Sequence, residues 1–177
     1  PNLTIGPDVV SSLRKYTDKL FDVHLMTMPA NNWLEPFAKA GADIITIHLE
    51  AEKDIKESLK IIKDLGLKAG ISIKPSTSEN ILEKYLELCD LVLVMTVNPG
   101  FGGQKFINTQ LKKIQNIKKM QKNMGITIDI EVDGGINKET SKLCIAAGAN
   151  VLVAGNAIFS ENVENYSSLI NLLRNNN

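Results

Sequence analysis

The stretch Ile126-Thr-Ile-Asp-Ile-Glu-Val-Asp-Gly-Gly-Ile136 decides how the rest of the chain is interpreted. Aliphatic and acidic side chains alternate from Ile128 to Asp133, which predicts a β-strand with one apolar face and one acidic face. Two glycines follow Asp133 and let the backbone approach a ligand closely, and Asn137 then has the character of a helix N-cap. A strand that ends in a carboxylate beside the N–H groups of a helix N-terminus suits an anionic substrate that undergoes proton transfer.

Length and composition indicate one compact domain over residues 1–177, with 44% hydrophobic residues. The 20 basic and 20 acidic residues balance, so no overall field draws the chain to nucleic acid or acidic lipid. No apolar run approaches the ~20 residues of a membrane span, and no signal peptide opens the chain. Cys89 and Cys144 fall in helical patterns and make no disulfide framework. We therefore expect a cytoplasmic protein without nucleic-acid or membrane partners.

Short apolar runs alternate with amphipathic stretches along the whole chain. The predicted strands are 21–26, 44–50, 68–74, 91–97, the opening stretch that ends at Asp133, and 151–154. The predicted helices are 8–19, 33–40, 55–65, 79–89, a long helix with its apolar stripe from 107 to 120, 138–147 and 163–174. About six βα units in a row predict an α/β fold with a parallel sheet and helices outside.

Polar residues within the strands favour a barrel over an open sheet. Strands of an open sheet are covered on both faces and are usually continuously apolar. Here several strands keep a polar face, made by Asp22 and His24, by Thr46, His48 and Glu50, by Ser72 and Lys74, and by Asp129, Glu131 and Asp133. In a barrel these side chains point inward and rise to a site at the C-terminal mouth. We therefore predict a (β/α)8 TIM barrel of which about six units are visible, the first two strands being missing.

The predicted interior is acidic, and unpartnered buried carboxylates are costly. We expect Lys74, the two histidines and a metal ion to be their neighbours. His48 and Glu50 have the character of supporting residues that hold ligands or pair with Lys74. Two further stretches suit an anion, the glycine-rich loop Val97-Asn-Pro-Gly-Phe-Gly-Gly-Gln104 and the pair Gly155-Asn156 after the last strand. A turn that needs positive φ explains the glycines of the first loop equally well.

At this point the residues resemble the ribulose-phosphate 3-epimerase family, metal-dependent barrel enzymes of pentose-phosphate metabolism. The resemblance covers essentially the whole chain. It is carried by Asn2-Leu-Thr-Ile-Gly-Pro7, Asp22-Val-His-Leu-Met26, Ile47-His-Leu-Glu-Ala51, Met95-Thr-Val-Asn-Pro-Gly-Phe-Gly-Gly-Gln-Lys-Phe106, Val132-Asp-Gly-Gly-Ile136 and Ala147-Gly-Ala-Asn-Val-Leu-Val-Ala-Gly-Asn156.

The resemblance implies an isomerase that interconverts D-ribulose 5-phosphate and D-xylulose 5-phosphate at C3 through an enediolate. It makes His24 and Asp133 ligands of one divalent metal ion, and Asp133 one of two acid/base carboxylates. Zinc suits these ligands best, with iron(II), manganese or cobalt as alternatives. The implied substrate-binding residues are His24, Gly100, Phe101, Gly102, Gly103, Asp133, Gly134, Gly135, Gly155 and Asn156, the last two at the phosphate. Met26 and Met95 would line the pocket.

The chain departs from the family at its front. The family's first two strands carry a serine near the substrate and a His-x-Asp that supplies two more metal ligands and the other acid/base, and these have no counterpart here. Because six strands do not close a barrel, we expect the protein to continue upstream by roughly 40–50 residues, enough for two strands and a helix. Expressed from Pro1 onward, the chain is expected to be unstable alone and to bind no catalytic metal tightly.

Two other functions are consistent with these motifs. A hexulose (allulose) 6-phosphate 3-epimerase would share nearly all of them, and a substrate assay separates the two. A chain that lacks the first strands could instead bind phosphates without catalysis, which a turnover assay decides. In each case we expect the partner to be a small-molecule sugar phosphate, and we expect a homo-oligomer.

Overall fold

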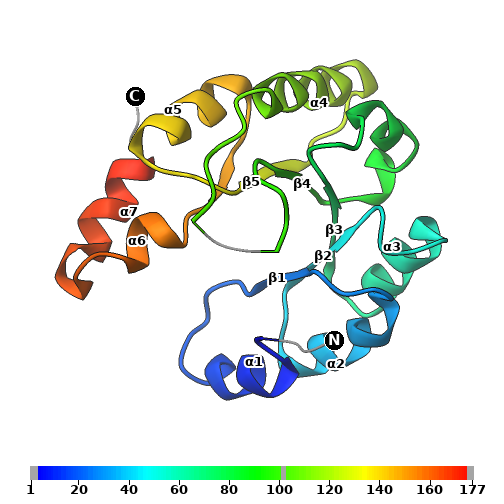
Figure 1. The fold of residues 1–177 in the computed structure, drawn as a ribbon. Helices are drawn as coiled ribbons and strands as arrows, with labels where there is room; N and C mark the ends of the chain where they lie inside the picture. Colours follow the sequence, from blue (N-terminus) through cyan, green and yellow to red (C-terminus); the bar gives the residue numbers. More distant parts are fainter. Residues whose placement is uncertain (1–3, 101–102, 175–177) are drawn as a thin grey trace.

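The computed structural model describes residues 4–100 and 103–174. Six parallel strands form one sheet in the order β1-β2-β3-β4-β5-β6, and the sheet curls with helices around its outer side (Figure 1). Every strand therefore pairs with the strand of the next unit along the chain. A doubly wound sheet would reverse its strand order at a switch point, so the predicted α/β barrel architecture is confirmed as a curled half-barrel.

The element bounds follow the predicted alternation of strands and helices. The strands are β1 (Asp22–Leu25), β2 (Ile44–His48), β3 (Lys68–Ile73), β4 (Leu91–Met95), β5 (Asp129–Asp133) and β6 (Val151–Val153). The α-helices are α1 (Pro7–Arg14), α2 (Asn31–Ala40), α3 (Ile55–Asp64), α4 (Gln110–Met124), α5 (Lys138–Ala147), α6 (Asn156–Phe159) and α7 (Tyr166–Arg174). Three 3-10 helices complete the set, η1 (Glu79–Lys84), η2 (Leu86–Leu88) and η3 (Val163–Asn165).

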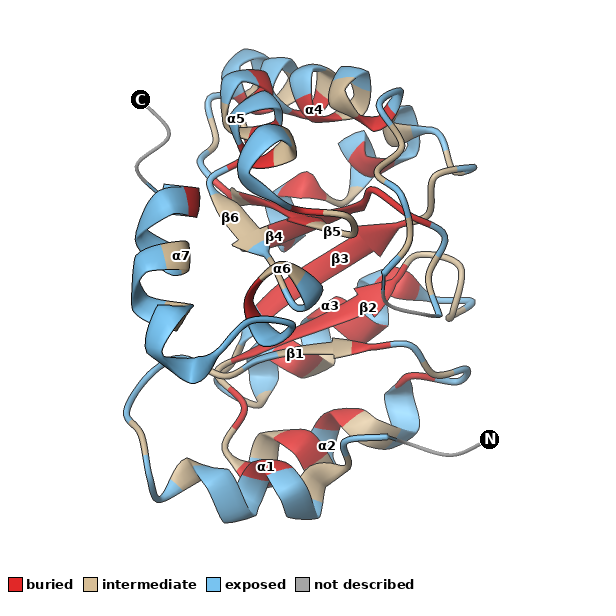
Figure 2. Cartoon of the chain, turned by 60° about the vertical axis from the view of Figure 1, so that its left-hand side comes forward, coloured by how far each residue is buried: buried red, intermediate tan, exposed pale blue. Residues whose placement is uncertain are grey.

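The two faces of the sheet differ as the alternation predicts. On the outer face, aliphatic side chains such as Ile47 and Val94 pack into one large core with the helices. The strands from β2 to β5 and the helix sides turned toward them are largely buried, the edge strands β1 and β6 are only partly buried, and the outer helix surfaces are exposed (Figure 2). On the inner face, polar residues are buried, among them Thr46, His48 and Glu131. The inner face is apolar around β4, where Leu91, Leu93 and Met95 form a small separate cluster with Ile44 and Val97, and at β6, where Val151 and Val153 lie beside Glu131 and Asp133.

Three predicted helices differ from the observed ones, and one observed helix was not predicted. The first ends at Arg14 instead of residue 19, and the predicted helix 79–89 is two 3-10 helices, with N–H to C=O bonds from Tyr85 to Leu82 and from Cys89 to Leu86. These three-residue bonds let Leu82 and Leu86 both reach the core. The last predicted helix begins with η3, and α6 was not predicted at all. No helix in the described part of the chain has the length and apolar composition needed to cross a membrane.

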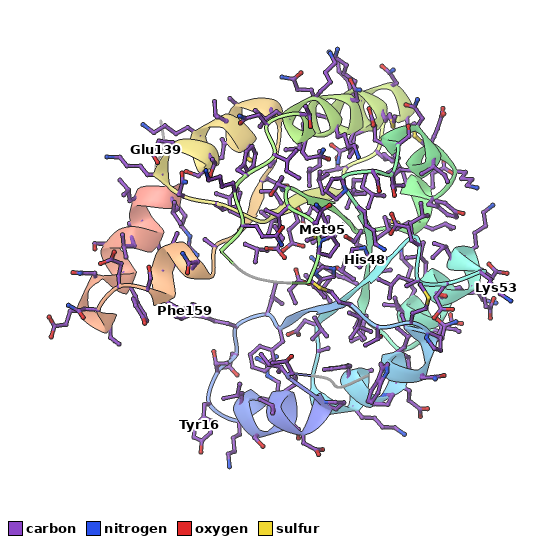
Figure 3. All side chains as sticks on the ribbon, viewed as in Figure 1. Tyr16, His48, Lys53, Met95, Glu139 and Phe159 are labelled. Carbon is purple, nitrogen blue, oxygen red and sulfur yellow. The ribbon has the colours of Figure 1, made fainter. Side chains whose placement is uncertain are left out.

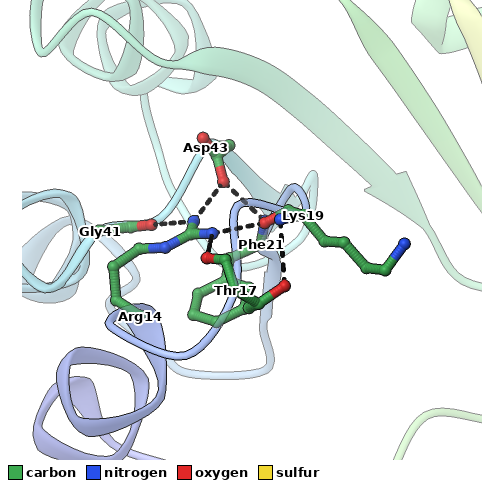
Figure 4. Close-up of polar contacts among 6 residues, drawn as sticks. All are labelled: Arg14, Thr17, Lys19, Phe21, Gly41 and Asp43. Carbon is green, nitrogen blue, oxygen red and sulfur yellow. Dashed lines mark hydrogen bonds and ion pairs between the residues drawn. The ribbon is translucent and has the colours of Figure 1, made fainter.

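Arg14 explains why the first helix is short. Its guanidinium donates to the carbonyls of Thr17 and Lys19, both at 2.6 Å, and to the carboxylate of Asp43 at 2.8 Å (Figure 4). The same Asp43 oxygen accepts the N–H of Phe21 at 2.7 Å, and the guanidinium lies 4.0 Å from the centre of the Phe21 ring. Because the charged group collects the carbonyls that follow α1, the chain turns there and enters β1 in register with β2.

Replacing Arg14 by Met is expected to lower the free energy of unfolding by about 2 kcal/mol, since several charge-assisted hydrogen bonds at a half-buried site are lost. Urea unfolding followed by circular dichroism measures the change. Lys60→Met, which alters an exposed side chain on α3, is the matched control and should change stability by less than about 0.5 kcal/mol. Equal stability of the two variants would contradict the role given to Arg14.

Gly70 lets β3 approach β2 closely on the inner face. It pairs in register with Thr46, and a Cβ added at Gly70 would lie 2.1 Å from Thr46 Oγ1 and 3.2 Å from Thr46 Cα. Such distances are far below van der Waals contact. The small residue is therefore required by the neighbouring side chain, since its own φ lies in the ordinary range.

Gly70→Ala is expected to destabilise the fold by about 1–3 kcal/mol through overpacking. The double variant Gly70→Ala/Thr46→Ala should recover part of that loss, because it removes the Oγ1 that the new methyl group would meet. Thermal unfolding of the two single variants and the double variant gives the coupling energy. Strictly additive losses would show that the two residues do not share this space.

Candidate active site

The candidate site lies at the carboxyl ends of β4, β5 and β6. Met95 pairs with Asp133 at the ends of β4 and β5, and Asp133 pairs with Val153 on β6. These ends, with the loops that follow them, surround a cavity of about 570 Å³. A cavity of this size at the C-terminal ends of parallel barrel strands is the usual place for a small-molecule site.

The structure brings most of the predicted site residues to this cavity. Its lining includes Met26, Met95, Gly100, Gly103, Asp133, Gly134, Gly135, Gly155 and Asn156. His24 lines an adjoining cavity that shares Met26 and Asp133 with the first. Phe101 and Gly102 lie outside the described residues. Met95 is labelled near the centre of the curled sheet together with His48, whereas Tyr16, Lys53, Glu139 and Phe159 lie at the outside (Figure 3).

The turn Gly134-Gly135 is held tightly against the end of β4. Gly134 has a φ of 122°, and a Cβ there would lie 2.4 Å from a methyl group of Val97. Gly135 has a φ of 65°, and a Cβ there would lie 2.7 Å from the backbone nitrogen of Phe106. Thr96 joins the two segments, because its N–H donates to Asp133 O at 2.8 Å and its hydroxyl to Gly134 O at 2.6 Å.

Sequence reasoning did not single out Thr96, Val97 or Phe106 as residues of this site. Thr96 is the polar one of the three, and its place next to the inward-facing Met95 could have marked it as a residue at the end of the strand. The groups that these three residues contact depend on how closely β4 approaches β5, which the sequence does not show.

The helices α5 and α6 begin at the cavity, and they differ in whether a side chain caps their first N–H groups. The predicted N-cap Asn137 is confirmed, because its side chain accepts from the N–H groups of Glu139 and Thr140, and Thr140 completes a capping box. The N-terminal donors of α5 are thus already used. At α6 the N-cap is Gly155, which has no side chain to offer. The N–H groups near Gly155 and Asn156 therefore remain the better place for an anion.

His24 connects two other side chains of the inner face. Its Nδ1 lies 3.9 Å from Asp133 Oδ2, and its Nε2 lies 2.9 Å from Nε2 of His48. Burial, followed by the neighbouring His48, lowers the pKa of His24 to about 3. His24 is therefore a neutral imidazole at neutral pH, which is the form that binds a metal.

Glu50 lies beside His48, whereas the sequence predicted that these two residues hold ligands or pair with Lys74. Its Oε2 lies 3.4 Å from His48 Nδ1, and its Oε1 accepts from the N–H of Lys74 and the hydroxyl of Thr77. Burial alone would raise the pKa of Glu50, but these hydrogen bonds outweigh it and lower the pKa to about 2. Glu50 is consequently ionised and acts only as an acceptor.

The expected role of Lys74 is wrong. Within the described residues no carboxylate lies at ion-pair distance from its ammonium group, and its link to Glu50 is made by the backbone N–H. The ammonium group of Lys113 on α4 reaches this region instead. It donates to the carbonyls of Lys74, Pro75 and Thr77 and so holds the loop after β3 in place. Strand alternation could not reveal that a lysine on an outer helix contacts the loop after β3.

Asp22 and Glu131 form a second acidic pair on the inner face. Burial, followed by the charges of Asp22 and Asp133, raises the pKa of Glu131 to about 8, and burial raises the pKa of Asp22 to about 6. A hydrogen bond joins the two carboxyl groups, and Glu131 carries the proton. Burial also raises the pKa of Asp133. A carboxyl group with a raised pKa is suited to exchange protons near neutral pH.

The acidic pair predicts how stability depends on pH. Because both pKa values are raised on folding, the folded chain holds more protons than the unfolded one, and stability falls as pH rises. The loss begins above the ordinary values of 3.8 and 4.5 and is complete once pH passes about 8. Glu131→Gln keeps a donor for Asp22 without ionising, so its stability should fall less between pH 5 and pH 9.

Urea unfolding of both proteins at pH 5, 7 and 9 measures this difference. Glu83→Gln, at an exposed position, serves as the control and should follow the parent protein. A Glu131→Gln variant with the same pH slope as the parent would contradict the raised pKa.

A divalent metal is compatible with two of the inner-face groups. The imidazole of His24 and the carboxylate of Asp133 face one another at 3.9 Å, and both are common ligands of zinc and related ions. Within residues 4–100 and 103–174, no three His, Cys, Asp or Glu side chains come together as a complete metal site. His24 and Asp133 would therefore supply part of a ligand set.

The fold and the site define the class of protein: a parallel α/β barrel with a carboxylate, an imidazole and a glycine-rich cavity at the carboxyl ends of its strands. Residues 1–159 match the Ribulose-phosphate 3 epimerase family. The ribulose-phosphate 3-epimerase of Bacillus subtilis is 49% identical over 162 residues, which are 91% of this chain and 75% of that protein. That of Synechocystis sp. is 46% identical over 177 residues, 99% of this chain and 76% of that protein. The chain therefore belongs to the ribulose-phosphate 3-epimerase family.

A solved structure with a different activity has the same fold. It is 3-hexulose-6-phosphate synthase, with a TM-score of 0.72 and 20% sequence identity over 96% of this chain and 80% of that one. At this identity the likeness concerns the fold alone.

Proposed function

We propose that the protein is a metal-dependent epimerase that interconverts D-ribulose 5-phosphate and D-xylulose 5-phosphate at C3. Family membership and the names of the relatives support the reaction. One observation in the structure carries it, namely that Asp133 faces His24 and lines the same cavity as Gly155 and Asn156. A proton-transferring group and a place for a phosphate thus share one space.

Asp133 is the proposed proton carrier for one face of the substrate carbon. Epimerisation next to a ketone removes a proton from one face and returns one to the other, so it needs a carrier on each side. Burial raises the pKa of Asp133, which makes this carboxyl group a stronger proton acceptor than a solvated aspartate. The resemblance assigns the opposite face to the Asp of a His-x-Asp pair, a pattern that does not occur in residues 1–177.

His24 Nδ1 and Asp133 Oδ2 are the proposed ligands of one divalent metal ion, zinc first, with iron(II), manganese or cobalt as alternatives. When bound, such an ion acts as a Lewis acid toward the negative charge that develops on the ketone and hydroxyl oxygens as the enediolate forms. His24 must then be neutral, which its lowered pKa ensures.

Gly155 and Asn156 are the proposed phosphate contacts. They line the cavity at the start of α6, and the competing helix start at α5 is already capped by Asn137. Gly100, Phe101, Gly102, Gly103, Gly134 and Gly135 are proposed as further substrate contacts, and Met26 and Met95 as apolar walls. A phosphate bound away from the reacting carbon supplies binding energy that positions the substrate.

The proposed setting is a cytoplasmic homo-oligomer that acts on a free sugar phosphate. Light scattering after size-exclusion chromatography tests the oligomeric state.

Asp133→Asn is expected to lower kcat by about 10²–10⁴-fold, because one proton carrier is lost, while the fold is retained. Turnover of D-ribulose 5-phosphate by the protein in its full natural length measures the loss. Asp129→Asn is the matched control, since Asp129 begins the same strand at its far end and its side chain accepts from Asn150. Activity of Asp133→Asn within tenfold of the parent protein would refute the assignment.

The same assay separates the alternative substrates. Faster turnover of allulose 6-phosphate than of ribulose 5-phosphate would identify a hexulose phosphate epimerase. Phosphate-ester binding without any turnover would identify a non-catalytic protein.

A further inference from the structure

The rings of His24 and His48 are close enough to determine where their protons lie. Their Nε2 atoms are 2.9 Å apart and the rings are tilted by 36°. This is a full hydrogen-bond distance, so one nitrogen carries a proton and the other accepts it. The other nitrogen of His24, Nδ1, is 3.9 Å from Asp133 Oδ2, which is too long for a hydrogen bond. A proton on Nε2 of His24 would use the short contact with His48, whereas a proton on Nδ1 would face Asp133 at a distance too long for a hydrogen bond.

The position of the second proton follows from the first. If His24 donates through Nε2, then His48 accepts through its own Nε2, and a neutral His48 carries its proton on Nδ1. Nδ1 of His48 and Oε2 of Glu50 are 3.4 Å apart, both are buried, and neither has another hydrogen-bond partner in the described part of the chain. In this tautomer the Nδ1–H of His48 faces the Glu50 carboxylate.

Glu50 is itself held in place by the loop after β3. Its second oxygen accepts from the Lys74 N–H and the Thr77 hydroxyl, and Lys113 fixes that loop through three backbone carbonyls. The carboxylate is thus a fixed acceptor and not a mobile surface group. Thr77 and Lys113 act on His48 only through Glu50.

We propose that Glu50, acting through His48, is a positioning residue that sets the tautomer of His24 and keeps its Nδ1 as a free lone pair facing Asp133. This inference rests on the proposed function, because a free lone pair at that point serves a metal ion held between His24 and Asp133. Partners of this kind orient metal-ligating imidazoles and typically change metal affinity by 10–100-fold when they are removed.

The tautomers are measured directly by nitrogen-15 NMR of the metal-free protein at its full natural length, labelled at histidine. Resonances of His24 and His48 are assigned from the variants His24→Asn and His48→Gln. We expect His24 to be protonated at Nε2 and His48 at Nδ1. A His24 protonated at Nδ1 would overturn the proposal, whatever the activity of the enzyme.

Removal of the acceptor supplies a second measurement. In Glu50→Leu, His48 loses the group that holds its Nδ1 proton, so both His24 tautomers should be populated and the affinity for Co²⁺, measured by chelator competition, should fall about 10–100-fold. Glu50→Gln retains a carbonyl acceptor and should keep the parent tautomer and an affinity within about threefold. Glu52→Gln, a nearby carboxylate whose Oε1 accepts from the Asn31 N–H, is the control for a general loss of charge.

These results separate the inference from the proposed function. Unchanged His24 nitrogen signals in a folded Glu50→Leu protein would overturn the positioning role even if the enzyme epimerises sugar phosphates. If Glu50→Leu does not fold, the histidine tautomers measured in the parent protein and in Glu50→Gln still test whether Glu50 sets the tautomer of His24. If the parent protein shows the expected His24 and His48 tautomers but has no epimerase activity, the arrangement Glu50–His48–His24 is upheld and the proposed reaction is refuted.

Discussion

Successive side chains of a strand point to opposite faces of its sheet, and this constraint determines where the ionisable groups of the chain lie. The helices cover one face with an aliphatic core, so the charged residues within β1, β2 and β5 have only the inner face left. Asp22, His24, His48, Glu131 and Asp133 all lie there, where His48 helps to lower the pKa of His24 and the charges of Asp22 and Asp133 help to raise the pKa of Glu131. The site is a consequence of this segregation, because the groups that cannot enter the aliphatic core gather beside the cavity.

Burial raises the free energy of every carboxylate on that face, and the chain meets this cost in two ways. Glu50 receives hydrogen bonds from His48, Thr77 and the Lys74 backbone, so its pKa falls to about 2 and it stays charged. Glu131 faces other acids and receives no such donors, so its pKa rises to about 8 and it stays protonated. The same desolvation therefore gives opposite protonation states. The pKa of Asp133 is raised by burial alone, which suits the proton-transferring role proposed for it.

Close backbone contacts give these groups a firm support. Gly134 and Gly135 admit no side chain because Val97 and Phe106 occupy the space, and Thr96 ties the two segments together. The carboxylate that precedes this turn is therefore fixed relative to the loop that follows β4. Such rigidity matters for catalysis, since small displacements of a reacting group cost large factors in rate.

The fold could be predicted from the sequence because it depends on local patterns, whereas the site residues were implied by the family resemblance and stay a prediction. Period-2 alternation identified the strands and their inner faces, glycines marked the turn after Asp133, and Asn137 was recognisable as a cap because capping involves neighbours three residues apart. Helix 79–89 was misread, since an apolar spacing compatible with an α-helix also fits two short 3-10 turns whose choice depends on the core they pack against.

Which side chains of the inner face contact one another was decided only by the tertiary structure. Whether His48 meets His24 depends on the register of β1 and β2, in which His24 pairs with Thr46. Lys74 and Lys113 are 39 residues apart, and which of them supports the Glu50 loop depends on how α4 packs over β3. The sequence alone determined which side chains face inward, because alternation is a property of a single strand. Distances between strands and across layers set the hydrogen bonds and the pKa values, and no local pattern encodes those distances.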